Sequence, residues 1–295
     1  NAFYGNDRII KEFAGLPDKY PLKFVIPHGV VFSRSYVWED ELKCNLASVM
    51  CYQQTRIDSY KDKMGRCQNV FRGAAPYTYI PELIGNNKKP TKGRGTILFP
   101  AHSTHNLTCE MDYELLAEKL VNLDEGYQPV TVCMYWRDYN LGRSDIFKKK
   151  GLSVVSAGHI FDPLFLFRFY YLCSLHEYSA CNQIGTHVFY AQYTGCKHFT
   201  IDAGDVSREA EAAVVERDSP ADVTECIEDL NKLLSHSLER INEKNNILED
   251  FLSPSLKKSR MGLKALLLKT ELIHLCYKST NSRLISNLRN VSRLL

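Results

Sequence analysis

Along residues 95–202, hydrophobic patterns typical of strands alternate with patterns typical of helices. A continuous apolar, β-branched run predicts a central strand at 129–136, and further strands are expected at 95–104, 152–158 and 196–202. Apolar residues on one helical face predict helices at 111–123, 145–151 and 185–195. The segment 159–175 is apolar on all faces and is also expected to be a helix. Strands that alternate with helices in this way predict an α/β fold with a parallel sheet and flanking helices.

The first ninety residues carry a weaker pattern. We expect a helix within 1–20, a buried strand at 21–29, a helix at 39–50, and loops around a weak strand before residue 85. The stretch GNNKKPTKGRG at 85–95 has the glycine and basic content of a linker. A further helix is expected at 220–238. We therefore divide the chain into an α/β part at 1–94, a second α/β part at 95–240 and a helical tail at 241–295.

Composition narrows the class of protein. The chain has 295 residues, of which 44% are hydrophobic, enough for a substantial core. Its net charge of +3 does not point to nucleic acid. No run of about 18 apolar residues predicts a membrane span. The ten cysteines lack C-x-x-C spacing, which favours the reduced thiols of a cytoplasmic protein.

The tail differs in charge from the rest of the chain. Residues 242–295 contain ten Lys or Arg and four Asp or Glu, a net +6, so the preceding residues carry 3 − 6 = −3. LKALLLKTELIHLCYK at 263–278 predicts a basic amphipathic helix. Such a helix suits the surface of an anionic inner membrane. It equally suits a helix that packs on the body with its lysines in solvent.

Several predicted strands end in polar residues, at the sheet edge where α/β proteins bind ligands. FPAHSTHN at 99–106 supplies the donors His102, Ser103 and Thr104, although turn formation explains them equally well. IPHG at 26–29 places His28 at a strand end, where an imidazole suits general-base chemistry near neutral pH or simply completes a turn. The acids soon after it give two alternative bases, Glu39 and Asp40.

The stretch SACNQIGTHVFYAQYTG at 179–195 places polar residues ahead of a short helix. The free N–H groups and dipole of a helix start bind phosphate, and Gly185, Thr186 and His187 would form that site. Asn182 and Ser179 would add hydrogen bonds. The alternative is an ordinary helix cap with Thr186 as the capping residue. The position beside residues 99–106 favours the phosphate site.

Further candidates follow the neighbouring strands. Tyr135 or Trp136 would stack on a base or sugar, and Arg137 would pair with a phosphate. Three others end strands or helices and either face the cleft or cap a helix: His159, Asp162 and Glu177. The chain lacks G-x-G-x-x-G, the P-loop, G-x-S-x-G and D-x-D. We therefore expect no cofactor and no metal.

These features resemble the two-domain GT-B glycosyltransferases, especially the bacterial enzymes that build capsule or O-antigen polysaccharide. The residues that carry the resemblance are YGND at 4–7, IPHG at 26–29, FPAHST at 99–104 and S-x-x-N-x-x-G-T-H-x-x-Y-A at 179–191. It covers about residues 1–235 and implies two Rossmann-like halves. The first half is short for such a domain, so upstream strands are expected to precede it.

The resemblance implies a function as well. A sugar would move without a metal from a CMP-, UDP- or GDP-linked donor to a glycan or lipid-linked acceptor, near the inner membrane face. Gly185, Thr186 and His187 would hold phosphate, with residues 102–104 in the same cleft and His28 at the acceptor. The family's acidic ribose ligand is not evident, so Asn182, His187 or Glu177 would replace it. A nucleotide-sugar epimerase, a polyol-phosphate transferase and a non-catalytic binding protein remain alternatives.

Overall fold

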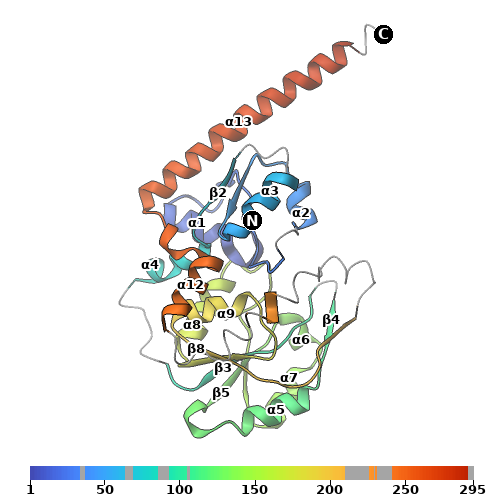
Figure 1. Cartoon of the computed structure of the whole chain (residues 1–295), viewed down its shortest axis with the longest axis vertical. Helices are drawn as coiled ribbons and strands as arrows, with labels where there is room; N and C mark the ends of the chain where they lie inside the picture. Colours follow the sequence, from blue (N-terminus) through green and yellow to red (C-terminus); the bar gives the residue numbers. More distant parts are fainter. Residues whose placement is uncertain are drawn as a thin grey trace.

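The structure, a computed structural model, describes residues 1–33, 37–63, 69–85, 93–104, 107–209, 226–228, 230 and 241–291. The chain folds as an α/β protein with parallel sheets flanked by helices, as the sequence predicts. Figure 1 shows the first half stacked on the second, with the helix α13 leaving the body. Most of the predicted helix at 220–238 and most of the linker at 85–95 fall outside the described residues.

The main sheet belongs to the second half. It has five parallel strands in the order β6-β5-β3-β7-β8. Their bounds are β3 Thr96–Phe99, β5 Val130–Cys133, β6 Ser153–Val155, β7 Tyr178–Cys181 and β8 Lys197–Thr200. All residues of β3 are buried, because this strand has a neighbour on each side and a layer of side chains on each face.

Strand β7 is absent from the sequence prediction, which treats its residues as a polar lead into the next helix. Its small residues Ser179, Ala180 and Cys181 are completely buried between β3 and β8. Successive strands step from β3 to β5 and β6 on one side, and the chain then returns to β7 on the other. The strand order therefore reverses between β3 and β7, which is the point where doubly wound sheets bind their ligands.

Two layers of helices cover the faces of this sheet. The helices are α5 Tyr113–Val121, η5 Glu125–Tyr127, α6 Trp136–Asn140, α7 Ser144–Lys149, α8 Phe165–Ser174 and α9 Thr186–Thr194. Leu98 packs in one core with residues of α5 and α7, while Phe99 packs in the other core with α8 and α9. The helix expected within 159–175 is α8, and its apolar residues do not bury every face, because Tyr171 is 56% exposed.

The first half contains a small parallel sheet of β1 Ser48–Cys51 and β2 Asn69–Arg72. The predicted strand at 21–29 is reduced to a single bridge from Val25 to Val49. The predicted helix at 39–50 is wrong in its second part, because the helix ends at Lys43 and the next residues enter β1. The helices of this half are η1 Phe3–Gly5, α1 Asn6–Ala14, α2 Glu39–Lys43, η2 Gln54–Arg56, α3 Ile57–Lys63, η3 Pro76–Tyr79 and α4 Ile80–Ile84.

The tail packs onto the rest of the molecule. The tail contains α12 Ile241–Leu252, η6 Pro254–Leu256 and α13 Arg260–Val291. In the second half, β4 Thr108–Glu110 and β9 Ser207–Glu209 form a separate antiparallel pair beside the main sheet. Leu252 accepts a hydrogen bond from the N–H of Ala75 at 2.9 Å, and Ser253 donates to the carbonyl of Tyr52 at 2.6 Å. Within the described residues, no helix is long and apolar enough to cross a membrane.

One hydrophobic core joins the halves. Ile9, Ile10 and Phe24 of the first half belong to the same buried cluster as Val188 and Phe189 of α9. This continuous packing fixes the loops that end the strands of the two halves against each other.

Candidate functional site

A pocket of about 370 Å³ lies where β3 and β7 end, between the two halves. This volume falls within the range of small-molecule sites, roughly 300–1,000 Å³. The second half lines it with residues 99–102 and Thr104, with Tyr135, and with residues 183–187. The polar and aromatic lining residues from the first half are Tyr4, His28, Phe32 and Trp38. The pocket therefore occupies the reversal point of the strand order.

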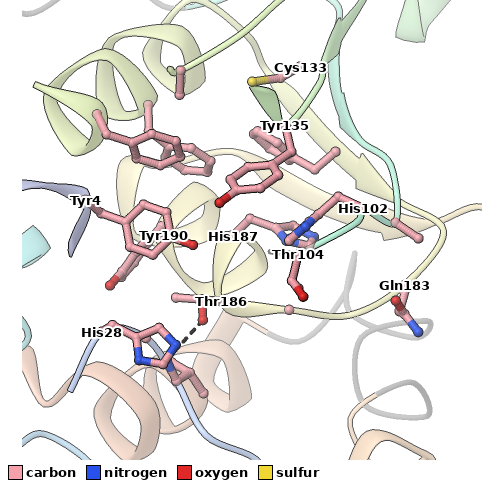
Figure 2. Close-up of a pocket in the computed structure, with 18 of the residues that line it drawn as sticks. Tyr4, His28, His102, Thr104, Cys133, Tyr135, Gln183, Thr186, His187 and Tyr190 are labelled. Atoms are coloured by element: carbon pink, nitrogen blue, oxygen red, sulfur yellow. Dashed lines mark hydrogen bonds between the residues drawn. The ribbon is translucent and has the colours of Figure 1, made fainter. Parts of the chain in front are cut away.

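The helix α9 starts at this pocket without a side-chain cap. Its N-cap residue is Gly185, and Thr186 is the first helical residue. The hydroxyl oxygen of Thr186 accepts a hydrogen bond from the N–H of Val30 at 3.0 Å, across the two halves (the dashed line in Figure 2). The alternative in which Thr186 caps the helix is therefore wrong. The N–H of Val188 donates to the carbonyl of Gly185 at 3.1 Å, whereas the N–H groups of Thr186 and His187 precede the first intrahelical bonds. The positive end of the helix dipole faces the pocket.

The ring of His187 folds over Gly185. Gly185 has an extended backbone, with a φ of −155°, so its conformation alone does not require glycine. A Cβ atom there would lie 3.0 Å from Nδ1 and from Cε1 of His187, so the absent side chain makes room for the imidazole. The other face of the ring lies 5.2 Å from Phe99, between centroids.

His187 presents a neutral imidazole. Burial, with His198 and His102 nearby, holds the pKa of His187 well below its ordinary value of 6.5. Its buried Nε2 has no hydrogen-bond partner among the described residues. Buried polar atoms are seldom left in this state, so this nitrogen marks a place for a ligand group.

The other two histidines lie on different walls. Figure 2 shows His28 apart from His102 and Tyr135, with Thr186 between them. The ring of His28 packs edge-on against Trp38, with the centroids 4.8 Å apart. His102 stacks at 4.7 Å on Tyr135, and its Nδ1 lies 2.9 Å from the carbonyl of Ser103. Because a carbonyl only accepts, this Nδ1 carries a proton.

Tyr4 is a pocket residue to which sequence reasoning gave no role. Its backbone is left-handed, with a φ of 58°, and its side chain lies near that of Tyr135. Burial, followed by the nearby Tyr135, raises the pKa of Tyr4 well above its ordinary value. Gly5 follows with a φ of 80°, and a Cβ there would lie 2.3 Å from the carbonyl oxygen of Pro163. The Tyr-Gly pair in YGND is the signal for this strained turn.

Two predicted donors build the walls of the pocket without lining it. Ser103 is completely buried, and its N–H and hydroxyl both donate to the carboxylate of Asp138, at 2.9 and 2.8 Å. Its oxygen also accepts from Arg143 at 3.1 Å. Asn182 accepts the N–H of Ala101 at 2.7 Å and so joins the loops that follow β3 and β7. These residues hold the strand-end loops in place.

The missed strand explains two residues that the structure places elsewhere. Ser179 lies within β7 and its hydroxyl is 2.9 Å from Nδ1 of His198, inside the sheet. Glu177 precedes β7, at the amino end of the strand, and pairs with Lys197 at 2.8 Å. Neither side chain lines the pocket.

The remaining candidates also lie outside the pocket lining. The rings of Trp136 and His159 pack at a tilt with their centroids 4.3 Å apart, and Arg137 donates to the carbonyl of Thr104. Asp162 accepts the N–H of Leu164 at 2.9 Å in the turn before α8. Leu164 is the N-cap residue of that helix and has no side-chain cap, so Asp162 does not fill the capping role that the sequence left open.

Asp162 also pairs with Arg168. Although partial burial opposes ionisation, the Leu164 N–H and the Arg168 guanidinium keep the pKa of Asp162 below its ordinary value. Glu39 pairs with Lys43 on α2 at 2.9 Å, away from the pocket, and the side chain of Asp40 is outside the described residues.

The pocket is polar without a full charge. Among the described residues that line it, histidine, tyrosine, tryptophan, threonine and glutamine side chains accompany apolar ones, and no Asp, Glu, Lys or Arg contributes. No group of three or more His, Cys, Asp or Glu side chains is placed to hold a metal ion in the described part of the chain. An anion at the start of α9 would therefore meet N–H groups, the helix dipole and neutral side chains.

Together, the fold and the pocket define an α/β protein with a pocket of small-molecule size at the reversal point of a parallel sheet. Neither a family model nor a curated protein matches the sequence. Among solved structures, a chain of the crystal structure of the GtfA/B complex matches with a TM-score of 0.40 and 10% identity. The match covers 84% of this chain and 52% of the other, so this chain spans about half of that chain's length. A likeness this distant carries no argument about function.

Proposed function

We propose that this chain is a glycosyltransferase that moves a sugar from a nucleotide-sugar donor to a glycan or lipid-linked acceptor of a surface polysaccharide. The observation that carries the proposal is the uncapped start of α9, which opens into the pocket beside the unpartnered Nε2 of His187. A helix start of this kind accepts phosphate oxygens. The sequence resemblance to GT-B enzymes supports the same activity.

The donor phosphates would contact the N–H groups of Thr186 and His187. The dipole of α9 stabilises the negative charge that grows on the leaving phosphate, and it does so without a cation. No carboxylate among the described lining residues offers the oxygen ligands that Mg²⁺ prefers, so we propose a metal-independent reaction. The hydroxyl of Thr104 lies on the same side of the pocket as a further donor.

His28 would act on the acceptor. It lines the pocket from the opposite half, whereas Glu39 does not line it. In the reaction, His28 takes the proton of the acceptor hydroxyl, and that oxygen bonds to the anomeric carbon. The bond from the anomeric carbon to the phosphate oxygen breaks, and the electron pair leaves with the nucleotide. General-base assistance of this kind is worth about 10²–10⁴ in rate.

Donor binding is the first test. A panel of CMP-, UDP- and GDP-sugars should include one that raises the melting temperature, because a ligand at a hundred times its Kd stabilises by about 2.7 kcal/mol. The double variant Thr186→Val, His187→Ala should lose this shift. A control variant, His159→Ala, Thr280→Val, removes the same residue types outside the pocket lining and should keep it. Absence of any shift across the panel would remove the main support for a transferase.

Product analysis separates the alternatives. A transferase releases free nucleotide only with acceptor present, whereas an epimerase converts the donor alone and a polyol-phosphate transferase moves the phosphate with the polyol. A non-catalytic protein that kept the fold would show neither a thermal shift with the donor panel nor any product. The His28→Ala variant should keep the donor shift and lose turnover by about 10²-fold or more. Equal turnover in this variant would exclude His28 as the base.

A further inference from the structure

The helix α13 buries one face against the body of the protein. The positions that it buries repeat every three or four residues and are Leu263, Leu267, Thr270, His274 and Tyr277. The body holds this helix with polar contacts as well. Arg260 donates to the carbonyl of Phe13 at 2.9 Å, and Glu271 accepts from the hydroxyl of Tyr20 at 2.8 Å. Part of the apolar face of residues 263–278 is therefore already occupied.

A second apolar stripe remains on the opposite side of the helix. Met261, Leu268, Leu272 and Leu275 have exposed fractions of 81%, 62%, 56% and 60%. At 100° per residue, their directions fall within about 60° of one another and about 150° from the buried face. Figure 1 shows α13 running past the first half and beyond the body. The exposed fractions place the four side chains of the stripe on the side of the helix that the body does not cover.

Positive charge surrounds the stripe. Lys264, Lys269 and Lys278 are exposed on the same helix. From residue 257 to residue 278 the chain has six Lys or Arg and one acid, which gives 6 − 1 = +5. The single acid is Glu271, which already contacts Tyr20 of the body. Of the six cations, Lys257 pairs with Glu82 of the first half. The exposed surface thus combines a row of large apolar side chains with exposed lysines.

We infer that this stripe docks on an anionic lipid bilayer. The helix lies in the plane of the interface, with the four apolar side chains among the acyl chains and the lysines at the lipid phosphates. A second copy of this chain is a poorer occupant, because two such helices would bring their lysines together, whereas an anionic surface neutralises them. The inference concerns location alone and does not depend on the chemistry of the pocket.

Vesicle flotation of the full chain tests the inference. The protein should bind vesicles of equal parts phosphatidylcholine and phosphatidylglycerol, bind vesicles of phosphatidylcholine much more weakly, and lose affinity as salt rises. The pair Leu268→Gln, Leu272→Gln should weaken binding roughly tenfold or more, because both side chains leave the acyl region. Each of Lys264→Gln and Lys269→Gln should weaken it about fivefold.

A matched control uses apolar residues of similar exposure elsewhere. Val121 and Leu141 of the second half are 45% and 52% exposed, so Val121→Gln, Leu141→Gln should bind vesicles as the native chain does. Circular dichroism and thermal unfolding check that all variants are folded. Equal binding by the leucine variant, or equal binding to neutral vesicles, would overturn the inference. So would a stable dimer in solution, measured by light scattering, that the leucine variant converts to monomer.

Discussion

The hydroxyl of Thr186 forms a hydrogen bond between the two halves, and the substitution Thr186→Val removes this hydroxyl with little change in side-chain volume. The hydroxyl accepts the N–H of Val30 at 3.0 Å, and Val30 is only 9% exposed. The approach is close, because a Cβ atom on Gly29 would lie 2.8 Å from this oxygen. Valine offers a methyl group in place of the acceptor, so the N–H of Val30 becomes buried without a partner.

The size of the effect follows from that lost acceptor. A buried donor left without a partner costs about 1–3 kcal/mol, which exceeds the roughly 0.5–1.5 kcal/mol net value of the bond itself. We expect Thr186→Val to lower the free energy of unfolding by about 1–3 kcal/mol. Thr186→Ser keeps the oxygen and loses one methyl group, so its loss should stay near 0.8 kcal/mol or below, roughly the value of one buried carbon.

Urea denaturation of the unliganded protein measures both variants. The midpoint should fall for the valine variant while the slope m stays unchanged, since the surface exposed on unfolding is the same. Equal stability of the valine and serine variants would refute the reasoning, because it would mean that the interdomain hydrogen bond contributes nothing. A changed m in the valine variant would show instead that the two halves no longer unfold together.

Two further predictions concern the pocket walls. Gly5→Ala should lower the free energy of unfolding by about 2–4 kcal/mol, because the backbone is left-handed and the new Cβ atom would clash with Pro163. The control Gly126→Ala has open space around the new Cβ atom and should change the free energy of unfolding by less than about 0.5 kcal/mol. The lowered pKa of His187 means that the native state binds fewer protons than the unfolded chain. Above about pH 6.5, His187 does not lower the free energy of unfolding. Below that pH, the free energy of unfolding falls by up to about 1.4 kcal/mol per pH unit, until the pH reaches the pKa of His187 in the folded state. Urea unfolding at about pH 7.5 and about pH 5.5 should show a smaller loss for His187→Gln than for the native chain, and equal losses would contradict this assignment.

The sequence predicted the α/β class because the strands of the second half are long apolar runs. It missed β7 because Ser179, Ala180 and Cys181 are small and lack such a run, and they form a strand only because β3 and β8 pair with them on both sides. With β7 missing, the reversal of strand order was invisible. Glu177 and Ser179 were therefore assigned to the cleft, although they lie before and within the strand.

Pocket residues were predictable where they follow strand ends in the sequence pattern. His28, His102 and the start of α9 belong to this group, and the structure brings them together. Tyr4 does not, because its position depends on how the first turn of the chain crosses to Pro163 of the second half. Such a long-range crossing leaves no local period, and only the Tyr-Gly pair hints at the unusual backbone.

Residues 252 and 253 return to the first half of the molecule, and these contacts affect when the first half can finish folding during synthesis. Ser253 donates to the carbonyl of Tyr52, 201 residues earlier, and Leu252 accepts the N–H of Ala75. Synthesis proceeds from the amino terminus, so the first half emerges from the ribosome while these partners have not yet been translated. The core of the first half therefore stays incomplete until the entire second half and the segment after it have been synthesised.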